Sequence, residues 1–239
     1  TGEYHTDPEE FAAACAELTD IGAAYIGGCC GTTPAFIEAL RLKLAGKKAV
    51  WTEKTVHGIC SASEVCAFGQ GVRVIGERIN PTGKKRFQQA LREKDMNYIV
   101  AQAVEQADAG AQILDINVGL PGIDEVDLMR RVVTAIGGAV GLPLQIDSSN
   151  PAAIEAGLRA APGKCLINSV NASESSLQTV LPLAKKYGAA IVGLALGESG
   201  LPSTSDERMA FAQKIVDAAV KQGIPREDIA IDCLTLTVS

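Results

Sequence analysis

The chain has 239 residues, of which 47% are hydrophobic and 21% are charged, the balance of an ordinary globular protein with a sizeable core. Its formal net charge of -6 gives no electrostatic case for binding nucleic acid, which favours basic faces. No apolar run is long enough to span a bilayer, so we expect no membrane partner.

The seven cysteines are an odd number at irregular spacing, which argues against a disulfide framework. They favour a reducing, cytoplasmic setting. Cys15, Cys165 and Cys233 lie inside apolar periodic segments, which is typical of buried thiols. Only the adjacent pair Cys29 and Cys30 is unusual.

The first 46 residues predict two helices with a short strand between them. Asp7-Pro8 is a helix start, and apolar residues then keep helical spacing until Gly22. Residues 23–26 predict a strand, and Thr33-Pro34 opens the second helix. Periodicity is lost from about residue 49 to residue 70. We interpret residues 47–70 as an interdomain linker that contains a small hairpin.

From residue 71 onward, short apolar strands alternate with helices. Strands are expected at 72–75, 111–116, 143–146, 165–168, 189–196 and 229–232, and helices after Asp95 and at 124–136, 151–160, 174–187 and 205–223. The alternation predicts a parallel sheet with about six βα units, about two short of a closed (β/α)8 barrel. A doubly wound sheet is the structural alternative, but its phosphate-binding glycine pattern does not follow the first strand.

Asp or Asn stands at or near the end of most of these strands. In a barrel the strand ends converge on one mouth, which would gather Glu77, Asn80, Asp115, Asn117, Asp147, Asn168 and Asp232. Carboxylates and amides without a cluster of Lys or Arg suit a neutral heterocycle rich in N–H donors, such as a pterin, better than a phosphate. The alternative is that such residues cap the following helices, which is our interpretation for Asn150 and Ser205.

Cys29 and Cys30 lie among glycines that allow the backbone to bend. Both thiolates could then ligate one zinc ion, but a zinc site needs further ligands, and no other Cys or His in the chain is an obvious partner. From the residues alone, a zinc site and a pair of core thiols in a tight turn are equally supported.

These motifs resemble those of the cobalamin-dependent methionine synthase family over essentially the whole chain. The stretch from Ile26 to Pro34 is similar to the terminal zinc motif of homocysteine S-methyltransferase domains, and that from Val74 to Gly83 is similar to the opening of the pterin-binding domain that follows them. The later motifs occur in the family's order: Leu114-Asp115-Ile116-Asn117, Ile146-Asp147-Ser148-Ser149-Asn150, Ile167-Asn168-Ser169 and Ile231-Asp232.

The resemblance implies that residues 1–46 end a homocysteine-binding (β/α)8 barrel and that residues 71–239 form a pterin-binding (β/α)8 barrel. The second barrel would bind methyltetrahydrofolate and pass its methyl group to cobalamin, carried by another domain, within methionine synthesis from homocysteine. Zinc held by three cysteines would activate homocysteine. Cys29 and Cys30 match two of these ligands, and the third is expected upstream of this chain.

The resemblance also implies roles for the residues at the mouth. Asp147 and Asn168 are expected nearest the pterin ring and its N5 atom, and Asp232 is expected to bind the ring's amino edge. Glu77, Asn80, Asp115 and Asn117 would complete the pterin contacts. Three alternatives stay open: a folate:corrinoid methyltransferase with another acceptor, a dihydropteroate synthase, and a non-catalytic folate-binding fragment.

Overall fold

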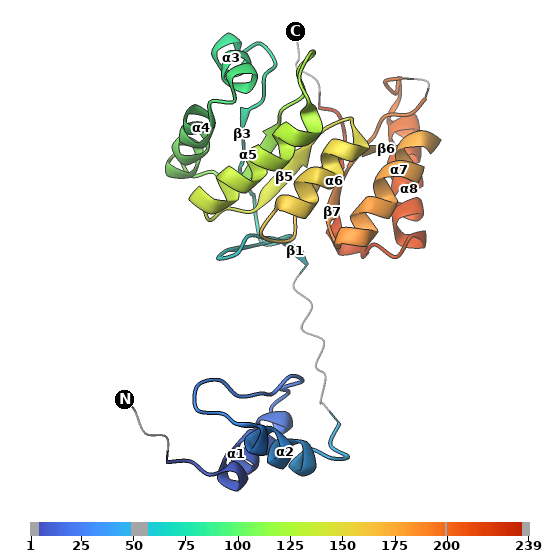
Figure 1. Cartoon of the computed structure of the whole chain (residues 1–239). Helices are drawn as coiled ribbons and strands as arrows, with labels where there is room; N and C mark the ends of the chain where they lie inside the picture. Colours follow the sequence, from blue (N-terminus) through green and yellow to red (C-terminus); the bar gives the residue numbers. More distant parts are fainter. Residues whose placement is uncertain (1–4, 49–56, 199, 236–239) are drawn as a thin grey trace. The chain divides into compact units, whose positions relative to one another are not determined.

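The computed structural model describes residues 5–48, 57–198 and 200–235 (Figure 1). The chain divides into two compact units between Thr55 and Val56. Part of the predicted linker, residues 49–56, lies outside the described residues. No helix in the described ranges is both long and apolar enough to cross a membrane.

The first unit is a pair of packed helices, α1 (Pro8–Asp20) and α2 (Pro34–Lys43). α1 begins as predicted, because the Asp7 side chain accepts a hydrogen bond from the backbone N–H of Glu10 at 2.8 Å. The strand predicted at residues 23–26 was wrong. A strand needs a hydrogen-bonded neighbour, and the described part of this unit contains none.

The second unit begins with an antiparallel hairpin, β1 (Gly58–Cys60) and β2 (Val65–Ala67), and continues with a parallel sheet. The sheet order is β3-β4-β5-β6-β7-β8, so each strand pairs with the next one in sequence. The strands are β3 (Ile75–Ile79), β4 (Ile113–Asn117), β5 (Leu144–Asp147), β6 (Leu166–Asn171), β7 (Ala190–Leu194) and β8 (Ile229–Asp232). Since β3 and β8 are not paired with each other in the described residues, the sheet is an open section of a (β/α)8 barrel. The predicted fold class is confirmed.

Helices connect successive strands and cover the outer face of the sheet (Figure 1). They are α3 (Lys85–Glu93), α4 (Met96–Asp108), α5 (Glu125–Ala139), α6 (Pro151–Ala160), α7 (Glu174–Tyr187), α8 (Ser205–Lys221) and the short 3-10 helix η1 (Arg226–Asp228). Neighbouring helices from α4 to α8 pack side by side. The Asn150 side chain accepts from the backbone N–H of Ala152 at 3.0 Å, which confirms it as the cap of α6.

Four details differ from the sequence predictions. The first sheet strand runs from Ile75 to Ile79 and not over 72–75, so Glu77 lies inside it. Helix α3 was not predicted, because it begins without a capping side chain. Helix α8 is capped by Thr204 and not by Ser205: Thr204 and Glu207 form a reciprocal capping box. Cys233 is exposed, since it follows the edge strand β8, whereas Cys15 and Cys165 are buried as expected.

The inner face of the sheet changes character along the strands. Residues paired across a parallel ladder point to the same side, and the register pairs Asp115 with Gln145 and Gln145 with Leu166. At the amino ends of the strands this face is apolar, with Ile113, Leu166 and Ala190 in one buried cluster. Toward the carboxyl ends it becomes polar. The polar half therefore lies at the mouth that the barrel rule predicts for a site.

The hairpin of β1 and β2 closes the amino ends of the strands. Ile59 and Cys66 are buried against the apolar cluster. The backbone N–H of Cys60 donates to the Lys164 carbonyl at 2.9 Å, and the N–H of Gly58 donates to Asp228 Oδ1 at 3.3 Å. The hairpin expected in this stretch is thus present, and residues 58–67 pack as part of the second unit.

Candidate functional site

Strands β4, β5 and β6 bring four of the predicted side chains together at the mouth. The register places Asn117 opposite Asp147 and Asp147 opposite Asn168. The Asn117 amide donates to Asp147 Oδ2 at 2.8 Å, and the Asn168 amide donates to Asp115 Oδ1 at 3.4 Å. Two amides and two carboxyls from three adjacent strands therefore form two separate hydrogen-bonded pairs that lie next to each other at the mouth, which we call the central group.

Gln145 belongs to the same group, although the sequence analysis did not single it out. Its side-chain amide donates to Asp115 Oδ1 one layer below Asp147. Gln145 is 5% exposed and Asp115 is 2% exposed, so the contact is buried. The sequence does contain a signal for Gln145: it is a polar residue two positions before Asp147, and therefore on the same face of an otherwise apolar strand.

Burial makes the two carboxyls of this group weaker acids than an exposed aspartate. Burial has the largest effect on Asp115 and raises its pKa to about 6. The hydrogen bond from Gln145 lowers this pKa, and the negative charge of Asp147 raises it. Burial also raises the pKa of Asp147, while the bond from Asn117 lowers it and the charges of Glu77 and Glu125 raise it further. Asp115 can therefore hold a proton up to a pH of about 6, and Asp147 holds its proton to a higher pH than an exposed aspartate does.

The remaining predicted residues lie at the edges of the sheet. Glu77 on β3 forms an ion pair with Lys84, whose Nζ lies 3.2 Å from Glu77 Oε2. A positively charged side chain therefore lies at this edge of the sheet. The Asn80 Oδ1 atom accepts from the N–H of Thr82 at 2.9 Å, which shapes the loop after β3. Asp232 is exposed on β8, and β7 separates it from Asn168. In the described residues, no hydrogen bond joins Asn80 or Asp232 to the central group.

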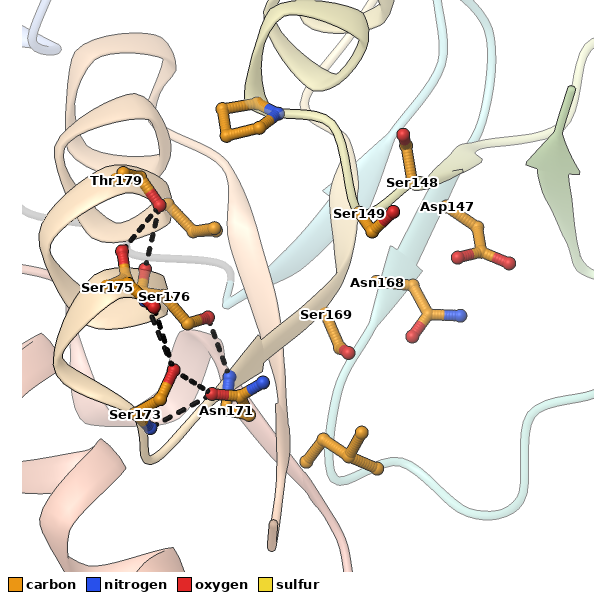
Figure 2. A pocket seen from close by; sticks show the side chains of 13 residues that line it. Asp147, Ser148, Ser149, Asn168, Ser169, Asn171, Ser173, Ser175, Ser176 and Thr179 are labelled. Atoms are coloured by element: carbon orange, nitrogen blue, oxygen red, sulfur yellow. Dashed lines mark hydrogen bonds between the residues drawn. The ribbon is translucent and has the colours of Figure 1, made fainter. Parts of the chain in front are cut away.

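A cavity of about 550 Å³ opens beside Asp147 and Asn168. Figure 2 shows these two residues on one side of it and the hydroxyls of Ser173, Ser176 and Thr179 at the start of α7 on the other. The full lining is Asp147, Ser148, Ser149, Pro151, Asn168, Ser169, Asn171, Ser173, Ser175, Ser176, Thr179, Val180 and Leu194. The polar lining carries a single carboxyl and no Lys or Arg, which suits a polar but uncharged ligand surface.

Cys29 and Cys30 supply two metal ligands but not a complete site. Their Sγ atoms are 3.8 Å apart and both residues are exposed. Two thiolates on one tetrahedral zinc ion stand about 3.8 Å apart, given Zn–S bonds of about 2.3 Å. However, no cluster of three or more His, Cys, Asp or Glu side chains suited to a metal occurs in the described ranges. The pair fits half of a zinc site.

Family comparisons agree with this geometry. Residues 76–239 match the family described as pterin binding enzyme, and residues 1–44 match the family described as homocysteine S-methyltransferase. The first match covers most of the chain, so this chain belongs to the pterin binding enzymes. The resemblance drawn from the sequence motifs is confirmed.

Among individual proteins, the chain is similar to the methionine synthases of two mycobacteria. It is 33% identical to that of Mycobacterium tuberculosis over 248 residues, and 32% identical to that of Mycobacterium leprae over 255 residues. Each match covers 99% of this chain and 21% of the relative, so the chain spans about a fifth of the length of these proteins.

Solved structures of dihydropteroate synthases share the fold. That of Xanthomonas albilineans, in complex with indole-2-carboxylic acid and 6-chloroguanine, has a TM-score of 0.53 at 22% identity and covers 70% of this chain and 61% of that one. That of Vibrio fischeri has a TM-score of 0.52 at 19% identity and covers 73% and 66%. At this level of identity the likeness establishes the fold alone.

Proposed function

We propose that the second unit binds 5-methyltetrahydrofolate at its mouth and transfers the N5 methyl group to a cobalamin carried by another domain. The transfer would be one step in forming methionine from homocysteine. The methionine synthase relatives and the pterin-binding family support this proposal. The unit's partners would then be the folate, a cobalamin domain and a homocysteine domain.

The observation that carries the proposal is the pair of amide–carboxyl hydrogen bonds that lie next to each other at the mouth. Asn117 holds Asp147, and Asn168 reaches Asp115, so each carboxyl is oriented before a ligand arrives. A pterin ring presents several N–H donors along one edge, and carboxyl oxygens are their natural acceptors. The adjoining cavity of about 550 Å³ has room for a heterocycle.

The residues of this chain assist the transfer by controlling the proton on N5. When the methyl–N5 bond breaks, its electron pair stays on nitrogen, and a proton delivered there makes the departing amine neutral. Asp147, whose pKa burial raises, is suited to hold that proton, directly or through water. Asn168 orients the ring and does not move the proton, because an amide is not basic. Reduced cobalamin would supply the electron pair that accepts the methyl group.

Asp232, Glu77 and Asn80 would make the outer contacts with the folate. Asp232 Oδ1 already accepts from the N–H of Leu234 at 2.8 Å, which leaves Oδ2 to receive the amino edge of the pterin. Asn80 Oδ1 is likewise engaged, by Thr82, so its amide N–H2 is the group that faces a ligand. In the described residues no hydrogen bond joins these three side chains to the central group, so each would contact the folate independently.

In the first unit, Cys29 and Cys30 would supply two of the ligands of a zinc ion. Zinc supplies Lewis acidity that stabilises the thiolate of homocysteine. The two exposed sulfur atoms already stand at the spacing that one zinc ion requires. Two thiols alone should bind zinc weakly, so the 239-residue chain is expected to lose zinc on gel filtration.

The test is titration calorimetry with 5-methyltetrahydrofolate, followed by a methyl-transfer assay with added reduced cobalamin. Replacing Asp147 by Asn keeps the shape of the side chain but removes its ability to hold and release a proton. We expect Asp147→Asn to weaken binding or transfer more than about tenfold, which corresponds to about 1.4 kcal/mol. The exposed Asp108→Asn is the matched control and should change neither.

The outcomes separate the proposed function from its alternatives. No heat of binding with the wild-type chain would refute folate binding altogether. Binding without methyl transfer to cobalamin would leave a folate-binding unit without the proposed reaction. Unchanged affinity and rate in Asp147→Asn would remove Asp147 from the mechanism. Condensation activity with a pterin diphosphate would instead favour dihydropteroate synthesis.

A further inference from the structure

The buried pair of Asp115 and Gln145 contains an unsatisfied acceptor. The Gln145 amide N–H2 donates to Asp115 Oδ1, but Gln145 Oε1 is buried and has no hydrogen-bond partner among the residues that the structure describes. A buried carbonyl oxygen without a donor is unfavourable, because it has given up its hydrogen bonds to water without a replacement. If the amide were turned over, Oε1 would face Asp115 Oδ1, and two acceptors would oppose each other. In either orientation of the Gln145 amide, one of the two possible hydrogen bonds between Gln145 and Asp115 has no proton.

We propose that Gln145 is a positioning residue of the folate site, which pairs with Asp115 as an amide pairs with a carboxylic acid. In that arrangement the Asp115 carboxyl accepts from the Gln145 amide through one oxygen and donates its O–H to Gln145 Oε1 through the other. Below its titration midpoint Asp115 then carries a proton inside the sheet, while Asp147, one layer nearer the mouth, stays free to act on the ligand. The functional part of this inference rests on the proposed function.

The charges that surround Asp115 favour the same protonation state. Asp147 on β5 and Glu77 on β3 are both acidic and both oppose ionisation of Asp115. Asn168 on β6 reaches Asp115 Oδ1 through its amide at 3.4 Å and carries no charge. No Lys or Arg among the described residues contacts Asp115 through a hydrogen bond or ion pair. When Asp115 is neutral, Asp147 also has no negatively charged Asp115 beside it.

The first arm of the test needs no ligand. Carboxyl carbon NMR of the 239-residue chain, with the Asp115 signal assigned from its loss in Asp115→Asn, should show Asp115 titrating with a midpoint of about 6. The side-chain amide signals of Gln145 should move with the same midpoint, because its partner changes from an acid to an anion. A midpoint near the ordinary aspartate value of about 3.9 would overturn the inference. So would Gln145 amide signals that do not follow the titration.

The second arm measures 5-methyltetrahydrofolate binding at a pH of about 5, below the expected Asp115 midpoint of about 6. Asp115→Asn should keep the dissociation constant within about threefold of the wild-type value, because the Asn amide mimics the neutral acid toward Gln145. Asp115→Ala and Gln145→Met should each weaken binding more than about tenfold. The exposed Gln213→Met is the control. Asp115→Asn losing as much affinity as Asp115→Ala would show that the anion is required. If the wild-type chain binds no folate, the proposed function fails, while the NMR titration still decides the protonation state.

Discussion

The raised pKa of Asp115 predicts a specific dependence of stability on pH. In the unfolded chain this carboxyl has its usual pKa of 3.8, and in the folded chain the pKa is about 6. Unfolding therefore releases a proton between these values, so stability is fully present below pH 3.8 and is lost as the pH rises toward 6. A shift of about 2.2 pKa units, each worth about 1.4 kcal/mol, gives a cost of about 3 kcal/mol above pH 6.

Asp115→Asn removes the ionisation but keeps the size and the hydrogen-bonding shape of the neutral acid. We expect the variant to match the wild type near pH 4 and to be more stable by about 2–3 kcal/mol at pH 8, because only the wild type then buries a charge. Urea unfolding followed by circular dichroism, at several pH values between 4 and 8, measures the difference. The exposed Asp108→Asn controls for the loss of one surface charge.

Two results would refute this reasoning. A stability difference that does not change between pH 4 and pH 8 would mean that Asp115 does not titrate in that window. A variant less stable than the wild type at pH 8 would mean that ionised Asp115 makes stabilising contacts, so that burial is not the dominant effect on its pKa. Both results would also weaken the assignment of a proton to the Asp115–Gln145 pair.

Two further variants test how local contacts hold the second unit together. Thr204→Ala should lower the free energy of unfolding by about 1 kcal/mol, because it removes the capping box of α8, whereas Ser205→Ala should change it little; equal effects in urea unfolding would contradict the assigned cap. Gly163→Ala should destabilise by more than about 2 kcal/mol, since its Cβ would lie 2.1 Å from the Cys60 carbonyl oxygen. Gly138→Ala, in the last turn of α5 with open space around it, should be neutral or stabilising in the same experiment.

Local signals in the sequence were sufficient to predict most of the second unit. Pro151 to Ala160 and Glu174 to Tyr187 form the helices expected from their caps and apolar spacing, and Gly188 ends the latter in a left-handed conformation with φ of 64°. Strand β8 also has its predicted bounds. These elements agree with prediction because cap, periodicity and termination signals all point to the same boundaries.

Predictions failed where a neighbouring element decides the outcome. Residues 23–26 have the composition of a strand but have no partner strand in the described part of the first unit. Strand β3 is placed by its pairing of Ile75 with Ile113, whereas Val72 and Val74, which suggested the predicted strand, precede β3 and are exposed. The division into residues 1–46, 47–70 and 71–239 stays a prediction.

The candidate site could be predicted in outline but not in its contacts. Strand ends identified Asp115, Asp147 and Asn168, because parallel strands bring their carboxyl ends to one edge. The bond between Asn117 and Asp147 depends on the register of β4 and β5, which no local pattern specifies. For the same reason Gln145 remained unrecognised as the partner of Asp115.

The hairpin at the amino ends of the strands also affects the chemistry of the opposite end. Because it covers Ile113, Leu166 and Ala190, it keeps water from reaching the interior carboxyls from the amino ends of the strands. The dielectric environment of Asp115 therefore depends in part on residues 58–67, which precede the first strand of the sheet. A chain cut at residue 71 would retain every polar side chain of the mouth, yet its interior would be hydrated and Asp115 would ionise at a lower pH. Proton affinity at this site is thus a property of the whole unit, including a segment at the end of the sheet opposite the candidate site.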